Sequence, residues 1–293
     1  MKYPIGIQAF EKIIEGGFVY VDKTDLIYRL VQGNVYFLGR PRRFGKSLLV
    51  STLESYFLGK KELFLGLAIE KLEHEWKQYP VFHLDFGTGN YLNDGALEDV
   101  LDSRLADWEQ QYGIDNSFKD LGLRFSRVLH AAHEQTGLGC VVLIDEYDKP
   151  ILDVLDQDYR VEHMGKTITL EEKHRNIMKS FYATFKGADA DLRFVFLTGV
   201  TKFSQISMFS GFNQPDDISL SRDYEAICGI TKDELVRYFA EPIAELAKKY
   251  HCTEEEMLQK LKVKYDGYHF SEEMQDIFNP FSLLNAFSNR KLL

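Results

Sequence analysis

A basic turn that ends in Gly-Lys-Ser is the segment of this 293-residue chain whose side chains most plainly imply a chemistry. An apolar run at residues 35–39 leads into the turn, and an amphipathic run at residues 48–58 follows it. A strand, a turn and a helix in this order hold phosphate groups, because backbone N–H groups and a helix N-terminus face the anion. In such an arrangement Lys46 reaches the β- and γ-phosphates of a nucleotide, and the Ser47 hydroxyl ligates Mg²⁺.

The turn departs from the general phosphate-loop pattern at one position. The pattern G-x-x-x-x-G-K-[ST] requires glycine at position 40, where this chain has Arg40, and Gly39 lies one residue too early. Either the loop is one residue longer than usual, or an arginine occupies the usual glycine site. A basic surface loop that happens to precede Gly-Lys-Ser is the remaining alternative. We expect a continuous stretch to bind the nucleotide: Arg40, Pro41, Arg42, Arg43, Phe44, Gly45, Lys46, Ser47 and Leu48.

A second candidate element is the apolar run at residues 141–144, which ends in Asp145 and Glu146. A continuous apolar run of this length is typical of a buried parallel strand. In phosphate-loop proteins the first acid at such a strand end supports Mg²⁺, and an adjacent glutamate polarises the attacking water. We therefore assign Asp145 to the metal, together with Ser47, and Glu146 to catalysis. Helix capping is the alternative role for the two acids.

A third apolar run, at residues 192–197, ends in small and polar residues. In open α/β sheets the ligand crevice lies at the carboxyl ends of the strands, so polar residues there contact the γ-phosphate or the water. Thr198, Thr201 and Lys202 are the candidates, and we name Thr198 and Lys202 as catalytic beside Glu146 and Lys46. The alternative is a polar strand end that merely begins a loop.

The rest of the pattern predicts the elements that position these side chains. Strands are predicted at residues 19–21, at 79–86 and within 217–228. Helices are predicted over residues 48–79, 94–111, 119–135 and 170–187. Thr231 and Glu234 match a capping box, so residues 231–293 are expected to be helical. By their position, residues 20–22 are a candidate lining for a nucleotide base.

Composition and charge exclude several classes of protein. No stretch reaches the roughly 18 apolar residues that span a bilayer, and the N-terminus lacks the apolar core of a secretory signal. The formal net charge of −10 argues against nucleic acid as an extended partner. Cys140, Cys228 and Cys252 are scattered and odd in number, which indicates reduced thiols and a cytoplasmic location.

Several short blocks of the sequence resemble the AAA-ATPase-like family, a bacterial and archaeal group of phosphate-loop proteins related to the AAA+ ATPases. The blocks run from residue 4 to residue 280 in the expected order. They are Pro4-Ile5-Gly6 with Phe10, Tyr20-Val21-Asp22-Lys23-Thr24, Arg40-Pro41-Arg42-Arg43-Phe44-Gly45-Lys46-Ser47, Leu143-Ile144-Asp145-Glu146-Tyr147-Asp148, Leu197-Thr198-Gly199-Val200-Thr201-Lys202-Phe203-Ser204, Tyr265-Asp266-Gly267-Tyr268 and Asn279-Pro280. The arginine-rich string is specific to this group, so Arg40 departs from phosphate loops in general but not from this family.

The resemblance implies an α/β fold of the P-loop NTPase type. It would have three αβα layers, a mostly parallel sheet of the ASCE and AAA+ kind, and a small helical C-terminal subdomain. We expect the ATPase core at residues 1–228 and a truncated, lid-like helical subdomain at residues 229–293. Family members commonly carry a nuclease-like domain after the ATPase part. This chain ends at Leu293, so no nuclease chemistry is expected.

The same resemblance implies ATP and ADP as ligands and Mg²⁺ as cofactor, with ATP hydrolysis that drives or gates a conformational change. The alternative is a nucleotide-gated interaction or regulatory module that binds ATP with little or no hydrolysis. A phosphotransferase is a third option, which no acceptor-binding motif supports. Further copies of the chain or a regulatory protein are candidate partners, because AAA-type enzymes often take an arginine from a neighbouring subunit. Arg222 is one candidate for that arginine, because it lies beyond the third apolar run.

Overall fold

The computed structural model describes residues 1–115, 117–200, 215–265, 268–270 and 276–292. The chain divides into two compact units. The first unit consists of residues 1–32, 40–76 and 217–293, and the second unit consists of residues 33–39 and 77–216. The phosphate-loop turn therefore belongs to the first unit, and the strand before it belongs to the second.

A mostly parallel sheet organises the second unit. Its strands in chain order are β1 (Val35–Gly39), β2 (Val81–Asp85), β3 (Cys140–Asp145), β6 (Leu192–Gly199) and β7 (Asp216–Asp217). In space the order is β2-β3-β6-β1-β7, and the pairs β2·β3, β3·β6 and β1·β6 are parallel. All six residues of β3 are buried, as expected of a central parallel strand with a continuous apolar sequence.

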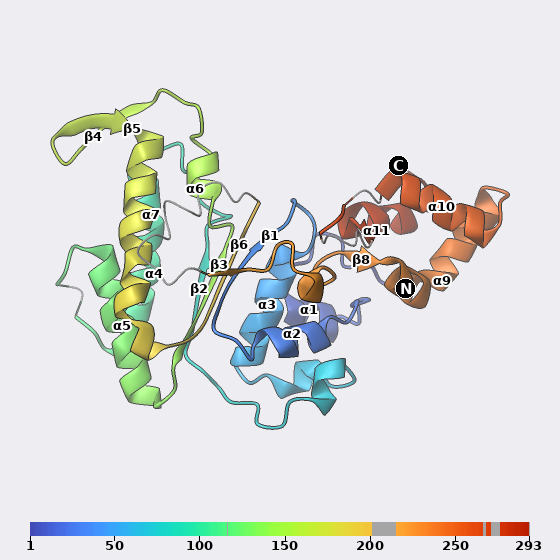
Figure 1. The fold of residues 1–293 in the computed structure, drawn as a ribbon, viewed down its shortest axis with the longest axis horizontal. Coiled ribbons are helices and arrows are strands. Elements are labelled where there is room, and N and C mark those ends of the chain that lie inside the picture. The colour runs from blue at the N-terminus through green and yellow to red at the C-terminus, as the bar shows by residue number, and fades with distance from the viewer. Residues whose placement is uncertain (116, 201–214, 266–267, 271–275, 293) are drawn as a thin grey trace. The chain divides into compact units, whose positions relative to one another are not determined.

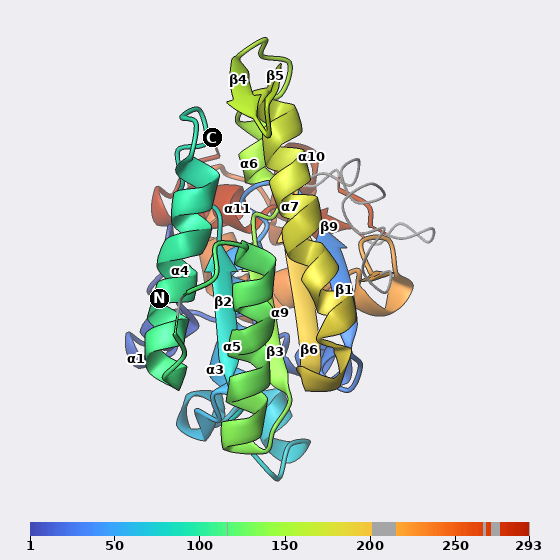
Figure 2. The same cartoon turned by 90° about the vertical axis from the view of Figure 1, so that its left-hand side faces the viewer.

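Three long helices cover one face of this sheet, as Figure 2 shows: α4 (Ala96–Tyr112), α5 (Leu121–Thr136) and α7 (Leu170–Gly187). The Asp120 carboxylate begins α5 by accepting a hydrogen bond from the N–H of Leu123 at 2.7 Å. The Thr169 hydroxyl does the same for α7, accepting from the N–H of Glu172 at 3.1 Å. Both caps satisfy amides that the first helical turn leaves without a backbone partner.

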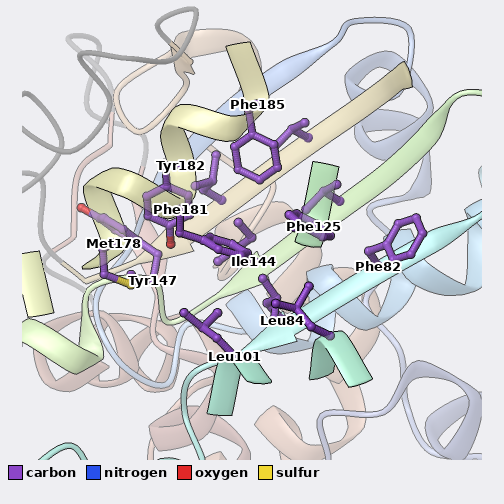
Figure 3. Close-up of a cluster of buried hydrophobic side chains, with 14 of the residues drawn as sticks. Phe82, Leu84, Leu101, Phe125, Ile144, Tyr147, Met178, Phe181, Tyr182 and Phe185 are labelled. Carbon is purple, nitrogen blue, oxygen red and sulfur yellow. The ribbon is translucent and has the colours of Figure 1, made fainter. Parts of the chain in front are cut away.

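The core of the second unit lies between these helices and the sheet (Figure 3). Phe125, Phe181 and Phe185 of the helices pack with Phe82 of β2 and Ile144 of β3 in one buried cluster. The rings of Phe125 and Phe181 stack with centroids 5.1 Å apart. Close packing of this kind fixes β2 and β3 firmly, and with them the side chains at their carboxyl ends.

Shorter elements complete the second unit: α6 (Lys149–Leu152), the antiparallel hairpin of β4 (Arg160–His163) and β5 (Lys166–Thr169), and η3 (Asp189–Asp191). The hairpin turns at Met164 and Gly165, and Met164 is 90% exposed.

The first unit is mainly helical. Its N-terminal parts contain α1 (Phe10–Glu15), α2 (Thr24–Leu30), α3 (Lys46–Phe57), η1 (Lys61–Phe64) and η2 (Ala68–Lys71). Its C-terminal part contains η4 (Arg222–Tyr224), β8 (Ile230–Thr231), α9 (Lys232–Lys249), α10 (Glu254–Tyr265), β9 (Ile277–Phe278) and α11 (Pro280–Ser288). Figure 1 shows α9, α10 and α11 lying together, and Phe239, Leu261 and Phe287 form part of their shared core. Thr231 and Glu234 form the predicted capping box at the start of α9.

The structure confirms the predicted α/β class with a mostly parallel sheet and flanking helices. The three helices predicted within residues 94–187 correspond to α4, α5 and α7. The predicted division of the chain at residues 228 and 229 remains a prediction, since the two compact units follow a different course along the chain. No helix in the described residues combines the length and the apolar character that crossing a bilayer requires.

Three predicted elements are wrong in whole or in part. The helix predicted over residues 48–79 ends at residue 57, because Gly59 adopts a φ of 69° and only short 3₁₀ turns follow. Residues 19–21 form no strand; Val19 makes a single backbone hydrogen bond to Lys2, at 2.9 Å. The strand predicted within residues 217–228 is limited to β7, because the chain turns where Ser221 N–H bonds to the Ile218 carbonyl.

Candidate functional site

The basic turn opens directly into α3. Gly45 is the N-cap of α3 and adopts a φ of 93°, in the left-handed region that favours glycine. Because glycine has no side chain, no side-chain cap occupies the N-terminus of α3 in the described structure. The positive end of the helix dipole at this position is suited to an anion.

Lys46 is folded back over the turn. Its Nζ donates hydrogen bonds to the carbonyl oxygens of Arg40 at 3.0 Å and Pro41 at 3.1 Å, and the side chain is buried. These contacts hold the ammonium group inside the curve of the loop. A phosphate oxygen is a stronger partner for an ammonium than a neutral carbonyl, so a bound phosphate would compete well for Lys46.

Arg40, the residue at the usual glycine position, is buried within the first unit. Its Nη1 donates to the carbonyl of Ser219 at 2.5 Å, and its Nη2 donates to those of Tyr224 at 3.2 Å and Glu225 at 3.4 Å. The guanidinium lies 4.0 Å from the centroid of the Phe270 ring. Burial lowers the pKa of the Arg40 guanidinium. The backbone of Arg40 lies outside the left-handed region, which explains why glycine is not required here.

The next residues of the turn also contact the C-terminal part of the first unit. Arg43 adopts a φ of 68°, and its guanidinium lies 4.2 Å from the centroid of the Phe281 ring. Phe44 is fully buried and packs edge-to-face on Phe270, with centroids 5.4 Å apart. Arg43 and Arg42 are both exposed, whereas Arg40 is buried. The three arginines of the turn therefore differ: one is buried, one is exposed beside the Phe281 ring, and one is exposed.

An apolar cavity of about 100 Å³ lies beside the turn. The cavity is lined by Gly45 of the turn and Leu49 of α3, together with Tyr20 and Val21. Tyr20 and Val21 are two of the three residues that the sequence suggests as a lining for the nucleotide base. Burial raises the pKa of the Tyr20 hydroxyl. The third residue, Asp22, has a structural role instead, because its carboxylate accepts hydrogen bonds from the N–H groups of Thr24 and Ala68.

Within the second unit, the strand register brings candidate side chains to one edge of the sheet. Asp85 at the end of β2 pairs with Asp145 at the end of β3. Leu38 of β1 pairs with Thr198 of β6, and β1 ends one residue later. Asp145 and Thr198 therefore lie at the carboxyl edge, where ligands bind in open α/β sheets.

Glu146 follows β3 in a backbone conformation that few residues other than glycine adopt. Its φ is 50°, and its N–H donates to Asp145 Oδ1 at 2.9 Å. A methyl group at Gly87 would lie 2.9 Å from Asp85 Oδ1 and 3.1 Å from Glu146 Oε2, so both carboxylates border this glycine. The carboxyl ends of β2 and β3 thus place three acids close together.

Thr198 and the residues after Glu146 connect the strand ends. Thr198 is buried, and its Oγ1 donates to the carbonyl of Leu38 at 2.9 Å. The N–H of Tyr147 donates to the Thr198 carbonyl at 3.1 Å, and the Asp148 carboxylate accepts from the N–H of Val200 at 2.9 Å. The Thr198 proton is directed at β1, which leaves its oxygen as an acceptor. The catalytic role of Thr198 stays a prediction.

The oxygen donors of the predicted metal site fit Mg²⁺. This ion takes one or two carboxylates and completes its shell with water and substrate phosphates. The Asp145 carboxylate and the Ser47 hydroxyl are donors of this kind, and the described residues contain no larger cluster of metal-binding side chains. Ser47 belongs to the first unit and Asp145 to the second, so their joint role remains a prediction. Lys202 lies outside the described residues.

Sequence reasoning missed Asp85, Phe270 and Phe281. Asp85 stands at the end of a predicted strand, so the rule that placed Asp145 at the site also applies to it. Phe270 and Phe281 are distant in sequence from the turn that they contact, and no local pattern pairs them with Arg40 and Arg43.

Comparison with known proteins gives one family and one relative. A family model described as "Predicted AAA-ATPase" matches residues 4–209. A curated protein from Azotobacter chroococcum mcd 1, described as "Uncharacterized protein in vnfD 5'region", is 38% identical over 292 residues, which cover 99% of this chain and 52% of the relative. The chain thus spans about half the length of that relative. No solved structure matches this chain.

Proposed function

This chain belongs to the predicted AAA-ATPase family, and on that premise we propose that it binds ATP with Mg²⁺ and hydrolyses it to ADP and phosphate. The family supports the use of a nucleotide. The proposal adds that the chain hydrolyses ATP and that hydrolysis drives or gates a conformational change.

The observation that carries the proposal is the position of Lys46 at a glycine-capped helix N-terminus. The ammonium group is held by the carbonyls of Arg40 and Pro41 at 3.0 and 3.1 Å, within the curve of the turn. The left-handed Gly45 lets the backbone approach an anion closely, since there is no Cβ to obstruct it. Helix dipole and lysine therefore favour phosphate at the same place.

The residues have distinct roles in the proposed reaction. Glu146 polarises a water molecule and accepts its proton as the water oxygen attacks the γ-phosphorus, while the bond to the β–γ bridging oxygen breaks and ADP leaves. Lys46 stabilises the negative charge on the β- and γ-phosphates, and Thr198 and Lys202 contact the γ-phosphate or the water. Ser47 and Asp145 hold Mg²⁺, which when bound neutralises part of the phosphate charge.

We assign the nucleotide base to the cavity beside Gly45. Its volume of about 100 Å³ is smaller than the roughly 150 Å³ cavity that holds benzene in a protein core, so a base must widen it. Phe239 of α9 and Leu284 of α11 line the cavity, and base binding would therefore displace these helices within the first unit. This displacement is the conformational change that we associate with the nucleotide.

Calorimetric titration with ATP and Mg²⁺ tests the binding step. The wild-type protein is expected to bind, and Lys46→Ala to weaken binding at least about tenfold, since a charge-assisted contact is lost. The unfolding temperature of the variant serves as the control for its fold. A correctly folded Lys46→Ala protein with wild-type affinity would contradict the proposal.

Phosphate release at saturating ATP tests the hydrolysis step. Glu146→Gln is expected to abolish turnover and to leave the affinity for ATP unchanged. Glutamine has nearly the same size as glutamate but lacks the carboxylate that polarises water. If wild type and variant release phosphate at the same low rate, the chain is the nucleotide-gated interaction module instead of an ATPase.

A further inference from the structure

The side chain of Arg40 links the phosphate-loop turn to the C-terminal segment of the first unit, residues 217–293. Arg40 is 1% exposed, and its guanidinium is surrounded by the carbonyls of Ser219, Tyr224 and Glu225 on its edge and by Phe270 on its face. A planar guanidinium can make these two kinds of contact together, whereas a lysine ammonium cannot.

The backbone of the same residue holds the catalytic lysine. Lys46 Nζ donates a hydrogen bond to the Arg40 carbonyl at 3.0 Å. The contacts that hold the Arg40 side chain in place therefore also hold the carbonyl oxygen that Lys46 binds. A short chain of contacts therefore runs from Phe270 through Arg40 to Lys46.

A second set of contacts fixes the turn at Phe44. The Phe44 carbonyl accepts a hydrogen bond from the N–H of Gly229 at 3.1 Å, and the Phe44 ring packs on the Phe270 ring. Gly229 adopts a φ of 92°, and a methyl group there would lie 2.3 Å from Ile277 Cγ2. The same methyl group would lie 3.3 Å from Phe44 Cδ1, so glycine at this position also leaves room for the ring of the turn.

We propose that Arg40 is a positioning residue and not a phosphate ligand. It fixes the shape of the phosphate-loop turn by anchoring it to Phe270 and to the carbonyls of residues 219, 224 and 225, and so makes nucleotide affinity depend on the C-terminal segment. The inference rests on the proposed function, because it takes the turn to be the site of ATP. It adds the route by which the C-terminal segment regulates that site.

Two substitutions separate this role from direct phosphate binding. Arg40→Lys keeps the positive charge but loses the planar contacts, and Phe270→Leu keeps apolar contact with Phe44 but removes the ring face under Arg40. A phosphate ligand that acts through its charge would tolerate both changes. Phe118→Leu is the matched control, since it removes a comparable contact to Arg127 (4.6 Å) from the surface of the second unit.

The first measurement uses the ligand-free protein. Hydrogen exchange of the amides at residues 42–48 is expected to become about tenfold faster in Arg40→Lys and Phe270→Leu, because the turn opens more often without its anchor. Phe118→Leu should exchange like the wild type at these amides. Unchanged exchange in both test variants overturns the inference and leaves the proposed function intact.

The second measurement is the affinity for ATP with Mg²⁺. Arg40→Lys is expected to raise the dissociation constant at least about tenfold and Phe270→Leu about three- to tenfold, and the double variant should be no weaker than Arg40→Lys alone. Faster exchange with unchanged affinity overturns the positioning role. Additive effects in the double variant also overturn it, since they assign independent roles to the two residues. A wild-type protein that binds no ATP overturns the proposed function and this inference together.

Discussion

Glu146 combines a catalytic assignment with a backbone conformation that costs stability. Its φ of 50° lies in the left-handed region, which costs an L-residue about 1–2 kcal/mol relative to the right-handed form. Such conformations persist where neighbouring contacts impose them, and they concentrate at functional sites. Here the N–H of Glu146 is directed at Asp145 Oδ1, at 2.9 Å, which holds the two candidate acids in a fixed relation.

Comparison of Glu146→Asn with Glu146→Gln tests this strain. Both variants lose the carboxylate, but asparagine tolerates the left-handed region better than glutamine does. We expect Glu146→Asn to unfold at a higher temperature by about 2 °C, equivalent to roughly 0.5–1 kcal/mol, with phosphate release abolished in both. Thermal unfolding of the two proteins in the same buffer is the measurement. Equal unfolding temperatures would mean that position 146 carries no backbone strain.

Gly87→Ala tests whether the position of the Glu146 carboxylate limits turnover. The added methyl group would lie 3.1 Å from Glu146 Oε2 and 2.9 Å from Asp85 Oδ1, so the carboxylates must shift by a few tenths of an ångström. We expect turnover to fall about tenfold, because catalysis depends on positioning, with the affinity for ATP changed less than about twofold. Steady-state phosphate release and calorimetry measure the two quantities. Equal losses in turnover and affinity would indicate a general distortion.

The sequence predicts where the candidate residues lie in the fold better than where their side chains point. Asp145 and Glu146 could be placed at a strand end because a continuous apolar run must be a buried strand and its last residues must be at the sheet edge. The direction of Arg40 could not be predicted. A basic turn favours phosphate electrostatically, and only the tertiary structure shows that this guanidinium lies against Phe270.

Among the elements, helices with strong apolar periodicity and capping residues were predictable, and short apolar turns were not. Thr231 and Glu234 cap α9 as expected, since the capping box is a local arrangement. The apolar residues Phe64 and Ile69 fit a helical pattern in the sequence. In the structure both are buried, but they belong to two separate 3₁₀ helices, η1 and η2. Periodicity reports that side chains are buried on one face, and tertiary packing determines which backbone presents them.

The cavity between α3, α9 and α11 offers a test at the level of elements. Leu284→Phe adds volume to a cavity of about 100 Å³ and is expected to weaken ATP binding about tenfold, because the base can no longer widen the space. Inorganic triphosphate, which lacks the base, should bind to wild type and variant equally. Competition against a fluorescent ATP analogue measures both ligands. Equal losses for ATP and triphosphate would place the base elsewhere.

The packing of α7 against α6 predicts a dependence of stability on pH. His174 is fully buried, its Nδ1 lies 2.7 Å from the Pro150 carbonyl, and its Nε2 has no hydrogen-bond partner in the described structure. Burial lowers the pKa of His174 below its ordinary value of 6.5, although the Pro150 carbonyl and Glu98 oppose the shift. Below pH 6.5 the unfolded chain therefore binds a proton that the folded chain does not.

The free energy of unfolding should consequently fall as the pH falls through 6.5 toward the folded-state pKa, by up to about 1.4 kcal/mol per pH unit from this group. His174→Gln removes the titrating group and should flatten this part of the profile. Urea unfolding between pH 5 and about pH 7.5 measures the slope. His251→Gln, at an exposed position, is the control and should keep the wild-type profile. A variant slope as steep as that of the wild type would rule out His174 as its source.

At the scale of the whole molecule, the two compact units do not follow the order of the sequence. β1 and α3 are separated by only the basic turn, yet they belong to different units, and the second unit is assembled from two separate stretches of chain. A linear division at residue 228 follows the order of the sequence, whereas grouping by contacts joins residues 1–32 and 40–76 with residues 217–293. The family model, which matches residues 4–209, includes parts of both units.

Whether one chain is sufficient for turnover is a question about the whole molecule. AAA-type sites are often completed by an arginine from a neighbouring copy, and Arg222, exposed at the start of η4, is the candidate here. If it acts in this way, turnover per chain should rise with chain concentration, and Arg222→Ala should hydrolyse ATP at least about tenfold more slowly. Phosphate release over a range of protein concentrations measures both effects.

Mixing two inactive variants distinguishes a shared site from a self-contained one. Glu146→Gln chains lack the residue that polarises water but keep Arg222, and Arg222→Ala chains have the opposite defect. In a mixed pair one of the two sites receives both functional residues, so equal amounts should recover about a quarter of the wild-type turnover if pairs form at random. A self-contained site recovers nothing, because each chain still lacks one residue of its own. Failure to recover activity would therefore exclude completion by Arg222 of a neighbouring chain, even if turnover depends on concentration.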